Sequence, residues 1–424
     1  MFNSYKIIIF RILQAISGLV ALLLVAEFLN PIEQGYYYTL GTVISLIWIF
    51  DLGMSQIAIN YLSKFFVKLS WKHNDLVGDS NNYFGALKRV FKYYLIASIF
   101  FIFVSPLFII FVRVDEYFSF LHLFILIICL TLLVALNFIF YPLLLFLESS
   151  KKIIKAYDLR IISNLLAIIF YLLFFLNDFN IWAIFSPQIS LLLINIFIIF
   201  NYKNLLKQFI KIKIADDKFF DILIFKSFPV YLSGFIISII FIPIIHNIYS
   251  PELSGKFGMT VIIFNLFALT GLSVYHFNIP NMIRIFQSGN ILKVNKVFLK
   301  CFFSFLFFYL LLFCLFVLII YIQDNYSALN YVKINDRVLD MNNLIILGIV
   351  ILIFNISLFY NYYFRLLLIE LFSINYCLYI LILIAGLFFL QLNISELLLY
   401  ILICTSILIL SNTYKFIKNK KKYF

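Results

Sequence analysis

The chain has 424 residues, of which 65% are hydrophobic and only 12% are charged. A water-soluble protein of this length needs far more charge on its surface, so the composition excludes the soluble globular class. Apolar runs of about 18 residues or more recur along the whole chain, and each could cross a bilayer as a helix. We therefore predict an all-α, multi-pass integral membrane protein.

The apolar runs predict about twelve membrane-spanning helices in two bundles of six. A polar loop at 201–218 separates the bundles, so we place one domain at 1–218 and the other, which ends in a basic tail, at 219–424. The predicted helices are 7–28, 36–62, 93–111, 118–147, 158–176, 181–200, 219–248, 256–279, 301–322, 344–366, 372–390 and 396–410.

Proline and glycine interrupt the pattern in two places. Pro31 and Gly35 predict a tight turn between the first two helices, since proline needs no amide partner and glycine permits unusual backbone angles. Three tyrosines, 36–38, follow this turn and suit the aromatic belt at a membrane surface. Pro142 predicts a kink in the fourth helix.

The stretch from Phe28 to Asn60 is echoed in the second half of the chain. A shift of 220 positions aligns Pro31 with Pro251 and Gly35 with Gly255, without a gap over about 30 residues. Such a match predicts an internal repeat. Because each half has an even number of helices, we expect the halves to share one orientation, related by a pseudo-twofold axis along the membrane normal.

Basic residues are unevenly distributed along the chain, whose net charge is +13. All but Arg113, Lys256, Lys333 and Arg337 of the 32 lysines and arginines fall on one predicted side, together with both termini. The positive-inside rule makes that side cytoplasmic. The basic excess is thus explained by topology and by contact with membrane lipids, and nucleic acid is not an expected partner.

Other motifs are absent from the sequence. It contains no G-x-x-x-x-G-K-[ST] and no long soluble segment, which argues against a self-contained ATP-driven pump. Its five cysteines lie inside apolar runs without a Cys-x-x-Cys pair, so we predict neither a disulfide framework nor a metal site.

The first two helices resemble those of a known family. The segments FLNPIEQGYYYTLGT and FDLGMSQIAINYLS are similar to the start of the bacterial O-antigen and polysaccharide flippases of the multidrug/oligosaccharidyl-lipid/polysaccharide exporter superfamily. SPELSGKFGMT, from Ser250 to Thr260, is similar to family members as well. The family's Leu-x-Pro-x-x-x-Gly loop and its Leu-Gly-Leu-like segment are matched by Leu29, Pro31 and Gly35 and by Leu52, Gly53 and Met54.

This resemblance implies two six-helix bundles that form a V around a central cavity. It implies that the chain flips undecaprenyl-diphosphate-linked oligosaccharides from the cytoplasmic to the outer leaflet of the bacterial inner membrane, by alternating access, for the assembly of O-antigen, capsule or exopolysaccharide. No bond is broken in this step, so neither a catalytic residue nor a cofactor is expected. The resemblance leaves coupling to H+ or Na+ open and suggests glycan polymerases as partner proteins.

Two other functions stay open. A cation-coupled drug or metabolite exporter of the same superfamily would share the helix plan and would carry acids that bind cations. A membrane glycan polymerase or ligase would have a large outer loop rich in arginine. The longest predicted outer loop, Gln323 to Asn343, contains Arg337 alone among arginines, which argues against such an enzyme.

Two polar stripes are candidate substrate-binding surfaces. Arg11, Gln14 and Gly18 share one face of the first helix, where the planar guanidinium of Arg11 would suit a phosphate. Alternatively, Arg11 reaches to the cytoplasmic headgroups. The second stripe, on the seventh helix, would face sugar hydroxyls or let helices pack closely, and consists of Ser227, Tyr231, Gly234 and Ser238.

Cations at the predicted inner helix ends are further candidates. Lys64 and Arg284 coincide under the 220-residue shift and could form a mouth that collects the diphosphate, and Arg365 is a similar inner-end cation. In the alternative interpretation these residues, like Arg160 and Lys226, only set the topology.

Asp51 is the one deep acid. It lies about 22 Å along the second helix, in the inner half of the membrane. It could bind a coupling ion or pair with Arg11, because a charge in the membrane usually faces a cavity or a partner. Alternatively, it forms a buried ion pair or a hydrogen bond between helices.

Overall fold

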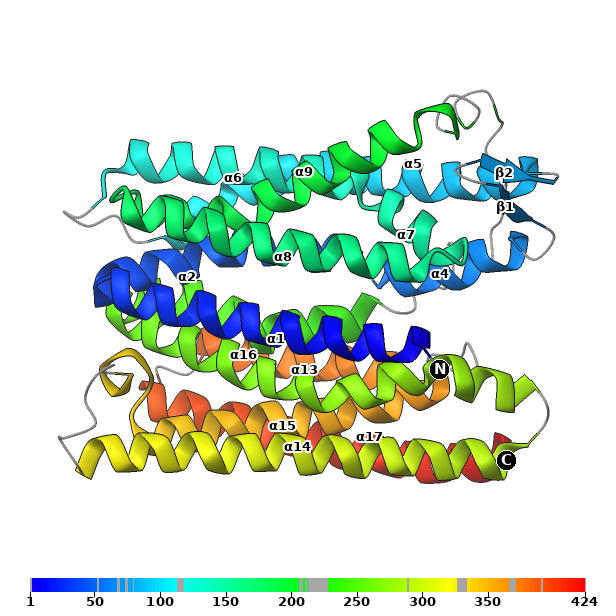
Figure 1. Ribbon diagram of the computed structural model, residues 1–424. Coiled ribbons are helices and arrows are strands. Elements are labelled where there is room, and N and C mark those ends of the chain that lie inside the picture. Colours follow the sequence, from blue (N-terminus) through cyan, green and yellow to red (C-terminus); the bar gives the residue numbers. More distant parts are fainter. Residues whose placement is uncertain are drawn as a thin grey trace. The chain divides into compact units, whose positions relative to one another are not determined.

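The structure is a computed structural model, and its described residues are almost entirely helical (Figure 1). This confirms the predicted all-α class. The described residues are 2–51, 53–66, 69–72, 75–78, 80–112, 118–205, 209, 212, 228–287, 290–325, 334–365, 371–389 and 392–423.

Eight helices in the described ranges are long and apolar enough to cross a membrane, and 16–28 and 373–387 form shorter apolar helices. Large apolar side chains along these spans remain exposed, such as Phe103 at 73% and Phe303 at 63%. Lipid tails can cover such side chains, whereas water would make them a large apolar patch. The chain is therefore a multi-pass membrane protein.

The chain forms two compact units. The first unit contains Met1–Leu24 and Thr39–Phe228, and the second contains Val25–Tyr38 and Pro229–Phe424. The corner between the first two helices is thus part of the second unit. The predicted domain boundary, between Lys218 and Phe219, lies outside the described residues.

The first unit is built from helices and one β-hairpin. Helix α5 packs on α6 and α8 packs on α9, while strands β1 and β2 pair antiparallel, with Trp71 opposite Leu76. Helices α1 (Phe2–Phe28) and α2 (Pro31–Ser45) belong to this unit except for the corner at Val25–Tyr38. The other elements are α3 (Ile47–Asp51), α4 (Met54–Phe65), β1 (Ser70–Lys72), β2 (Asp75–Val77), α5 (Asn81–Val104), η1 (Ser105–Phe111), α6 (Phe120–Phe140), α7 (Pro142–Ser149), α8 (Ile153–Leu176), η2 (Asn180–Phe185) and α9 (Ser186–Asn201).

The predicted turn from Pro31 to Gly35 is wrong, because Pro31 already begins α2. Asn30 is the N-cap: its side chain accepts from the Glu33 amide at 2.9 Å, and the Glu33 carboxylate accepts from the Asn30 amide at 3.0 Å. This reciprocal capping box stabilises a helix start by about 1 kcal/mol. The chain turns before Pro31, and proline occupies the first helical residue, where no amide donor is needed.

The predicted second helix, 36–62, is divided into α2, α3 and α4. The second break contains Gly53, whose φ of 70° and ψ of 17° are left-handed. Glycine adopts these angles without the steric cost that a Cβ would impose. The break ends α3 at Asp51 and places this acid at a helix terminus.

One further helix boundary differs from the prediction, and another agrees with it. Helix α5 begins at Asn81 and not near residue 93. The prediction relied on apolar runs and missed its first turns, because these include the charged residues Lys88 and Arg89. The predicted kink at Pro142 is confirmed, because α6 ends at Phe140 and α7 begins at Pro142.

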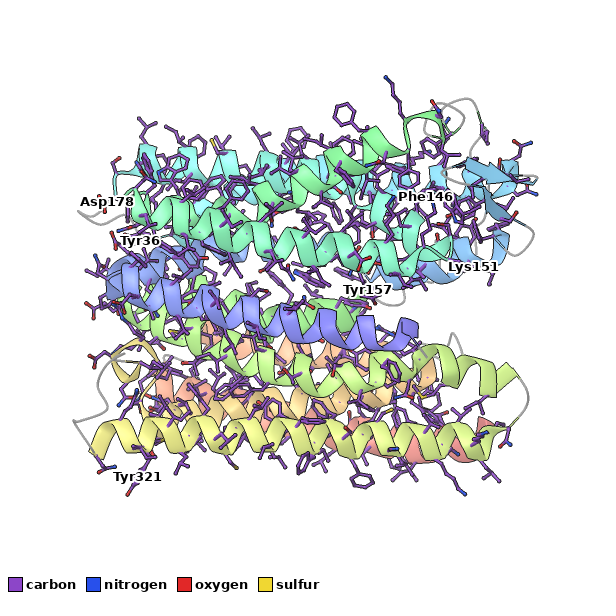
Figure 2. All side chains as sticks on the ribbon, viewed as in Figure 1. Tyr36, Phe146, Lys151, Tyr157, Asp178 and Tyr321 are labelled. Atoms are coloured by element: carbon purple, nitrogen blue, oxygen red, sulfur yellow. The ribbon has the colours of Figure 1, made fainter. Side chains whose placement is uncertain are left out.

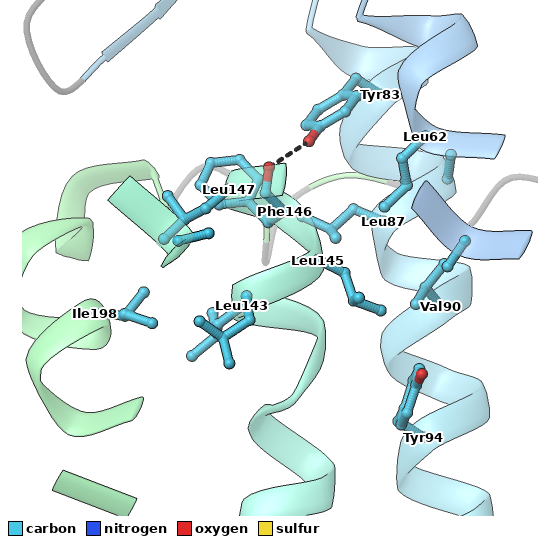
Figure 3. Close-up of a cluster of buried hydrophobic side chains, with 14 of the residues drawn as sticks. Leu62, Tyr83, Leu87, Val90, Tyr94, Leu143, Leu145, Phe146, Leu147 and Ile198 are labelled. Carbon is cyan, nitrogen blue, oxygen red and sulfur yellow. Dashed lines mark hydrogen bonds between the residues drawn. The ribbon is translucent and has the colours of Figure 1, made fainter. Parts of the chain in front are cut away.

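The core of the first unit lies between α4, α5, α7 and α9 (Figure 3). Leu87 and Val90 of α5 meet Leu145 of α7, and the Tyr83 hydroxyl donates to the Phe146 carbonyl at 3.3 Å. Tyr94, one turn after Val90, is completely buried. This packing holds α5 and α7 in register and thereby fixes where Tyr94 points.

The second unit contains the remaining helices. Residues 228–235 are helical and lead into a π-helical turn, η3, before the next α-helix. The elements are η3 (Ile236–Ile240), α12 (Phe241–Ile248), α13 (Pro251–Gln287), α14 (Ile291–Asn325), η5 (Asn335–Arg337), α15 (Met341–Arg365), α16 (Ser373–Phe389) and α17 (Ile394–Tyr423).

The two copies of the repeated motif meet inside the second unit. A Cβ added to Gly35 would lie 1.9 Å from the Pro251 carbonyl oxygen, and one added to Gly255 would lie 2.9 Å from the Gly35 nitrogen. The Gln34 side-chain amide, which is 1% exposed, donates to the Gly255 carbonyl at 3.0 Å and to the Arg337 carbonyl at 3.1 Å. The motif therefore forms a close backbone contact between α2 and α13.

The tyrosines that follow the motif are buried, so the expected aromatic belt at 36–38 is wrong. Tyr36, labelled in Figure 2, is 0% exposed and meets the His246 ring edge-on at 4.8 Å between centroids. Tyr38 packs against Gly258, where an added Cβ would lie 2.7 Å from the Tyr38 Cβ. These aromatic rings fill the interior beside the glycine contact.

Candidate functional site

Asp51 lies at the end of α3 and is 9% exposed. The Tyr94 hydroxyl, from α5, donates to Asp51 Oδ1 at 2.5 Å, and the Ser55 hydroxyl, from α4, donates to Oδ2 at 3.2 Å. Next to this pair, the Tyr93 hydroxyl donates to the Phe50 carbonyl at 2.8 Å. The carboxylate, on the helix before the break at Gly53, is thus held by hydroxyl groups from two helices that follow the break.

A second polar group lies on the other side of Tyr94. The Tyr141 ring lies 5.7 Å from the Tyr94 ring, and Arg160 of α8 is a polar neighbour of Tyr141. The Arg160 Nη2 atom lies 2.5 Å from Glu148 Oε1 of α7. These contacts join α3, α5, α7 and α8 through polar side chains inside an apolar bundle.

Sequence reasoning treated Arg160 as a topological cation and did not single out Glu148 or Tyr141. Glu148 and Arg160 belong to two different helices with the turn at 150–152 between them, so no helical spacing connects them. Glu148 also precedes a run of basic residues that resembles an ordinary cytoplasmic loop. An acid at the end of one apolar run and a cation at the start of the next is the only signal in the sequence that could have suggested this pair.

The hydrogen-bonded carboxylate of Asp51 can be neutralised in two ways. A buried carboxylate is costly as an anion unless it is paired, hydrogen-bonded or neutralised. It can therefore take up a proton, or bind a monovalent cation together with the neighbouring hydroxyl oxygens. Arg11, the ion-pair partner considered from the sequence, has its side chain outside the described part of the structure.

A separate cationic site lies in the second unit, where two of the predicted residues come together. Arg365, the last residue of α15, donates to the Tyr231 hydroxyl at 2.9 Å, and its guanidinium lies 4.8 Å from the centre of that ring. A guanidinium is a planar cation whose geometry suits a phosphate or carboxylate.

Two more tyrosines build the surroundings of Arg365. Tyr275 of α13 and Tyr362 of α15 stack with ring centroids 5.4 Å apart and an interplanar angle of 17°. The Tyr275 hydroxyl donates to the Tyr362 carbonyl at 3.1 Å. Neither tyrosine was selected from the sequence, because the 28 tyrosines of this chain make each one uninformative by itself.

The other predicted site residues are not brought together by the described contacts. Gln14 is half-buried on α1, and Lys64 is exposed on α4. Ser227 lies outside the described residues, and the side chains of Arg11, Ser238 and Arg284 are likewise undescribed. Within the described ranges, no group of three His, Cys, Asp or Glu residues could hold a metal ion.

Comparisons with known proteins identify the fold. Neither a protein-family model nor a curated protein sequence matches this chain. Its structure is similar to that of a MATE P26A mutant, with a TM-score of 0.61 and 14% identity over 99% of this chain and 95% of the other. It is also similar to a multidrug resistance MATE family transporter of the MOP superfamily in an outward-facing conformation, with a TM-score of 0.61 and 13% identity over 98% and 94%.

A third similar structure is a MOP superfamily transporter from Pyrococcus furiosus whose binding pocket is described as having reverse polarity, suggesting a different function. It shares 12% identity with this chain, covers 98% of it and 94% of its own length, and has a TM-score of 0.62. All three likenesses extend over nearly the whole of both chains. The chain therefore has the fold of the MATE transporters of the MOP superfamily.

Proposed function

We propose that this protein is a secondary transporter that exports an organic solute across the bacterial cytoplasmic membrane and is driven by the uptake of H+ or Na+. The observation that carries the proposal is Asp51, a buried carboxylate held by Tyr94 and Ser55 inside a membrane-spanning bundle. The protein works by alternating access, with both termini in the cytoplasm as the distribution of lysine and arginine predicts.

The energetic argument starts from the cost of the Asp51 charge. A carboxylate in the membrane interior is expensive and is retained where it has a task or a partner. The described partners of Asp51 are hydroxyl groups and the neighbouring backbone amides of Gly53 and Ser55, and such uncharged donors stabilise an anion less than a cation does. Binding of a proton or Na+ neutralises Asp51, so the free energy of the bundle changes with the ion gradient. That dependence is what a coupling site requires.

The comparisons support export of an organic solute as the task. One similar structure is described as a multidrug resistance transporter, and this chain is similar to it over nearly its whole length. A transporter of this kind needs no catalytic residue and no cofactor, since translocation breaks no bond. An enzymatic function is not supported by any similar structure.

A transport assay tests this proposal. Liposomes that contain the purified protein are loaded with ethidium, an organic cation. The movement of ethidium is followed by fluorescence after a pH or Na+ gradient is imposed. We expect gradient-dependent transport that falls by about tenfold or more in Asp51→Asn, which keeps the shape of the side chain but removes its charge.

Asp178→Asn is the matched control for this assay. Asp178, labelled in Figure 2, is exposed in a turn with φ of 60°, where asparagine is also accepted. This variant undergoes the same chemical change and should transport normally. Gradient-driven transport that is unchanged in Asp51→Asn would contradict the role of Asp51.

The second candidate is flipping of undecaprenyl-diphosphate-linked oligosaccharides, with glycan polymerases as partner proteins. The contact between Arg365 and Tyr231 favours it, because this site offers a cation and aromatic rings where the first unit offers an acid. A guanidinium can bind a diphosphate, and tyrosine rings can stack on sugars. The resemblance of the first two helices to polysaccharide flippases points in the same direction.

A deletion strain that lacks paralogues separates the two candidates. If the chain is a flippase, lipid-linked repeat units accumulate on the cytoplasmic face, and Arg365→Gln fails to restore their movement while Arg365→Lys restores part of it. If the chain is a solute exporter, repeat units reach the outer face in the deletion strain at the normal rate.

A further inference from the structure

The most extended polar feature of the first unit is a chain of side chains from four helices. It begins at Asp51, passes through Tyr94 and Tyr141, and ends at the ion pair of Arg160 and Glu148. Asp51 is 9% exposed, whereas the side chains of Arg160 and Glu148 are 26% and 11% exposed. The Arg160 end is therefore the more accessible to water.

The charges of the ionised side chains in this arrangement do not balance. Two carboxylates and one guanidinium leave one negative charge when both acids are ionised. The tyrosines are neutral phenols near neutral pH and do not balance it. A single proton would make the whole group neutral, which the apolar surroundings favour.

We propose that Asp51, Arg160 and Glu148 form one proton-binding array, in which the proton binds at Asp51 and the balance of charge between Arg160 and Glu148 sets the pH at which it binds. The proton enters from water at the exposed end, forms an O–H bond on a carboxylate oxygen, and returns to water when that bond breaks. This inference rests on the proposed function, since it names the ion and the residues that respond to it.

The surroundings of the array explain why its members act together. Tyr141 experiences the charges of Asp51, Arg160 and Glu148, and so lies between the two ends.

Arg160 is a positioning residue in this array. Its positive charge favours the ionised form of Asp51, and the negative charge of Glu148 opposes this effect. The other ionisable groups that face the array are Tyr93 beside Asp51 and Tyr157, one turn before Arg160 on α8 and labelled in Figure 2.

Infrared titration of the purified protein tests the array without any transported solute. The band of protonated carboxyl groups is followed against pH, and Asp51→Asn identifies the contribution of Asp51. In Glu148→Gln, Arg160 is left unbalanced and favours ionised Asp51, so the midpoint moves to lower pH. In Arg160→Met, a second negative charge is left unbalanced, so the midpoint moves to higher pH. We expect shifts of about one pH unit.

Two further variants separate this role from a merely structural one. The double variant Glu148→Gln, Arg160→Met again leaves one uncompensated acid, so its midpoint should return close to that of the unmodified protein. Arg160→Lys keeps the charge and should retain most of the normal behaviour. Lys203→Met removes an exposed lysine and controls for net charge. All variants are first compared by size-exclusion elution and thermal unfolding.

The outcomes distinguish the array from the proposed function. Shifts of the same sign in both single variants, or an unchanged midpoint in Glu148→Gln, would overturn the array even if ethidium transport follows the gradient. Opposite shifts together with absent ethidium transport would support the array and refute the proposed export. If Arg160→Met fails to fold, Glu148→Gln and Arg160→Lys still decide the question.

Discussion

Gly35 and Gly255 show how much one residue depends on a distant partner. Both lie on helices, and each faces backbone atoms of the other motif copy at distances that leave no space for a side chain. The pattern Pro-x-x-x-Gly looks the same for a turn and for the first turn of a helix. The glycine is explained by the neighbouring α13 and not by the local backbone.

Substitution of Gly35 by alanine should therefore destabilise the second unit. The new Cβ would lie 1.9 Å from the Pro251 carbonyl oxygen, and a backbone atom cannot rotate away as a flexible side chain can. We expect the overpacking to cost about 1–3 kcal/mol, or to prevent folding. Thermal unfolding in detergent, read by fluorescence-detected size exclusion, measures the effect.

Gly41→Ala is the control for this prediction, since Gly41 lies on the same helix and its nearest neighbour would be the Ile184 Cδ1 atom at 4.0 Å. Both changes gain the same helix propensity, about 1 kcal/mol. Gly41→Ala should leave the protein equally stable or more stable. Equal unfolding temperatures for the two variants would show that the glycine contact is not required.

At the scale of elements, the break between α3 and α4 is the feature that creates the Asp51 site. The sequence from Tyr36 to Leu62 is apolar enough to be one helix, and Gly53 alone is a weak sign of a break. The left-handed angles at Gly53 separate Asp51 on α3 from Ser55 on α4 and still allow both to meet.

Gly53→Ala should weaken this break. A Cβ in the left-handed region costs about 1–2 kcal/mol, so we expect a lower unfolding temperature. Gly53→Asn should be milder, because asparagine tolerates these angles better than alanine does. Thermal unfolding of both variants checks the order, and an alanine variant at least as stable as the asparagine variant would contradict it.

The β-hairpin between α4 and α5 was not expected, since no element was predicted between the helices at 36–62 and 93–111. Trp71 attaches it to the turn between α7 and α8: its indole N–H donates to the Ser150 carbonyl at 2.6 Å, and Lys152 Nζ lies 3.5 Å from the ring centre. The hairpin is thus held by a hydrogen bond and a cation–π contact rather than by its own two strands.

Trp71→Phe should loosen the hairpin by about 1–2 kcal/mol, because the donor is lost and the smaller ring binds the lysine less well. Limited trypsin digestion measures the effect as faster cleavage within 68–72. Lys418, an exposed residue of α17, provides an internal reference, because cleavage after it should keep its rate. Unchanged cleavage in the hairpin would show that Trp71 does not anchor it.

For the whole molecule, the distribution of charge is the strongest topological signal. All but four of the 32 lysines and arginines lie on one predicted side, and this bias predicts an orientation without reference to any contact. The long apolar helices agree with a multi-pass protein.

Reporter fusions test the predicted orientation. Green fluorescent protein fused after Phe424 should fluoresce, and alkaline phosphatase fused there should be inactive, because the tail is predicted to be cytoplasmic. Alkaline phosphatase inserted at 336–340 should be active, because this segment is predicted to face outward. The reverse pattern would invert the topology and the direction of export.

The sequence by itself determined the membrane class, the approximate helix plan, the repeated motif and the predicted orientation. These properties depend on composition, charge and local order along the chain, which are visible in any single sequence. Only the tertiary structure decided that Gly35 meets Pro251, that Asp51 meets Tyr94, and that Arg365 meets Tyr231. In a bundle whose helices are apolar on nearly every face, the spacing of polar residues does not specify which helices pack together. Their partners are selected by packing between distant segments.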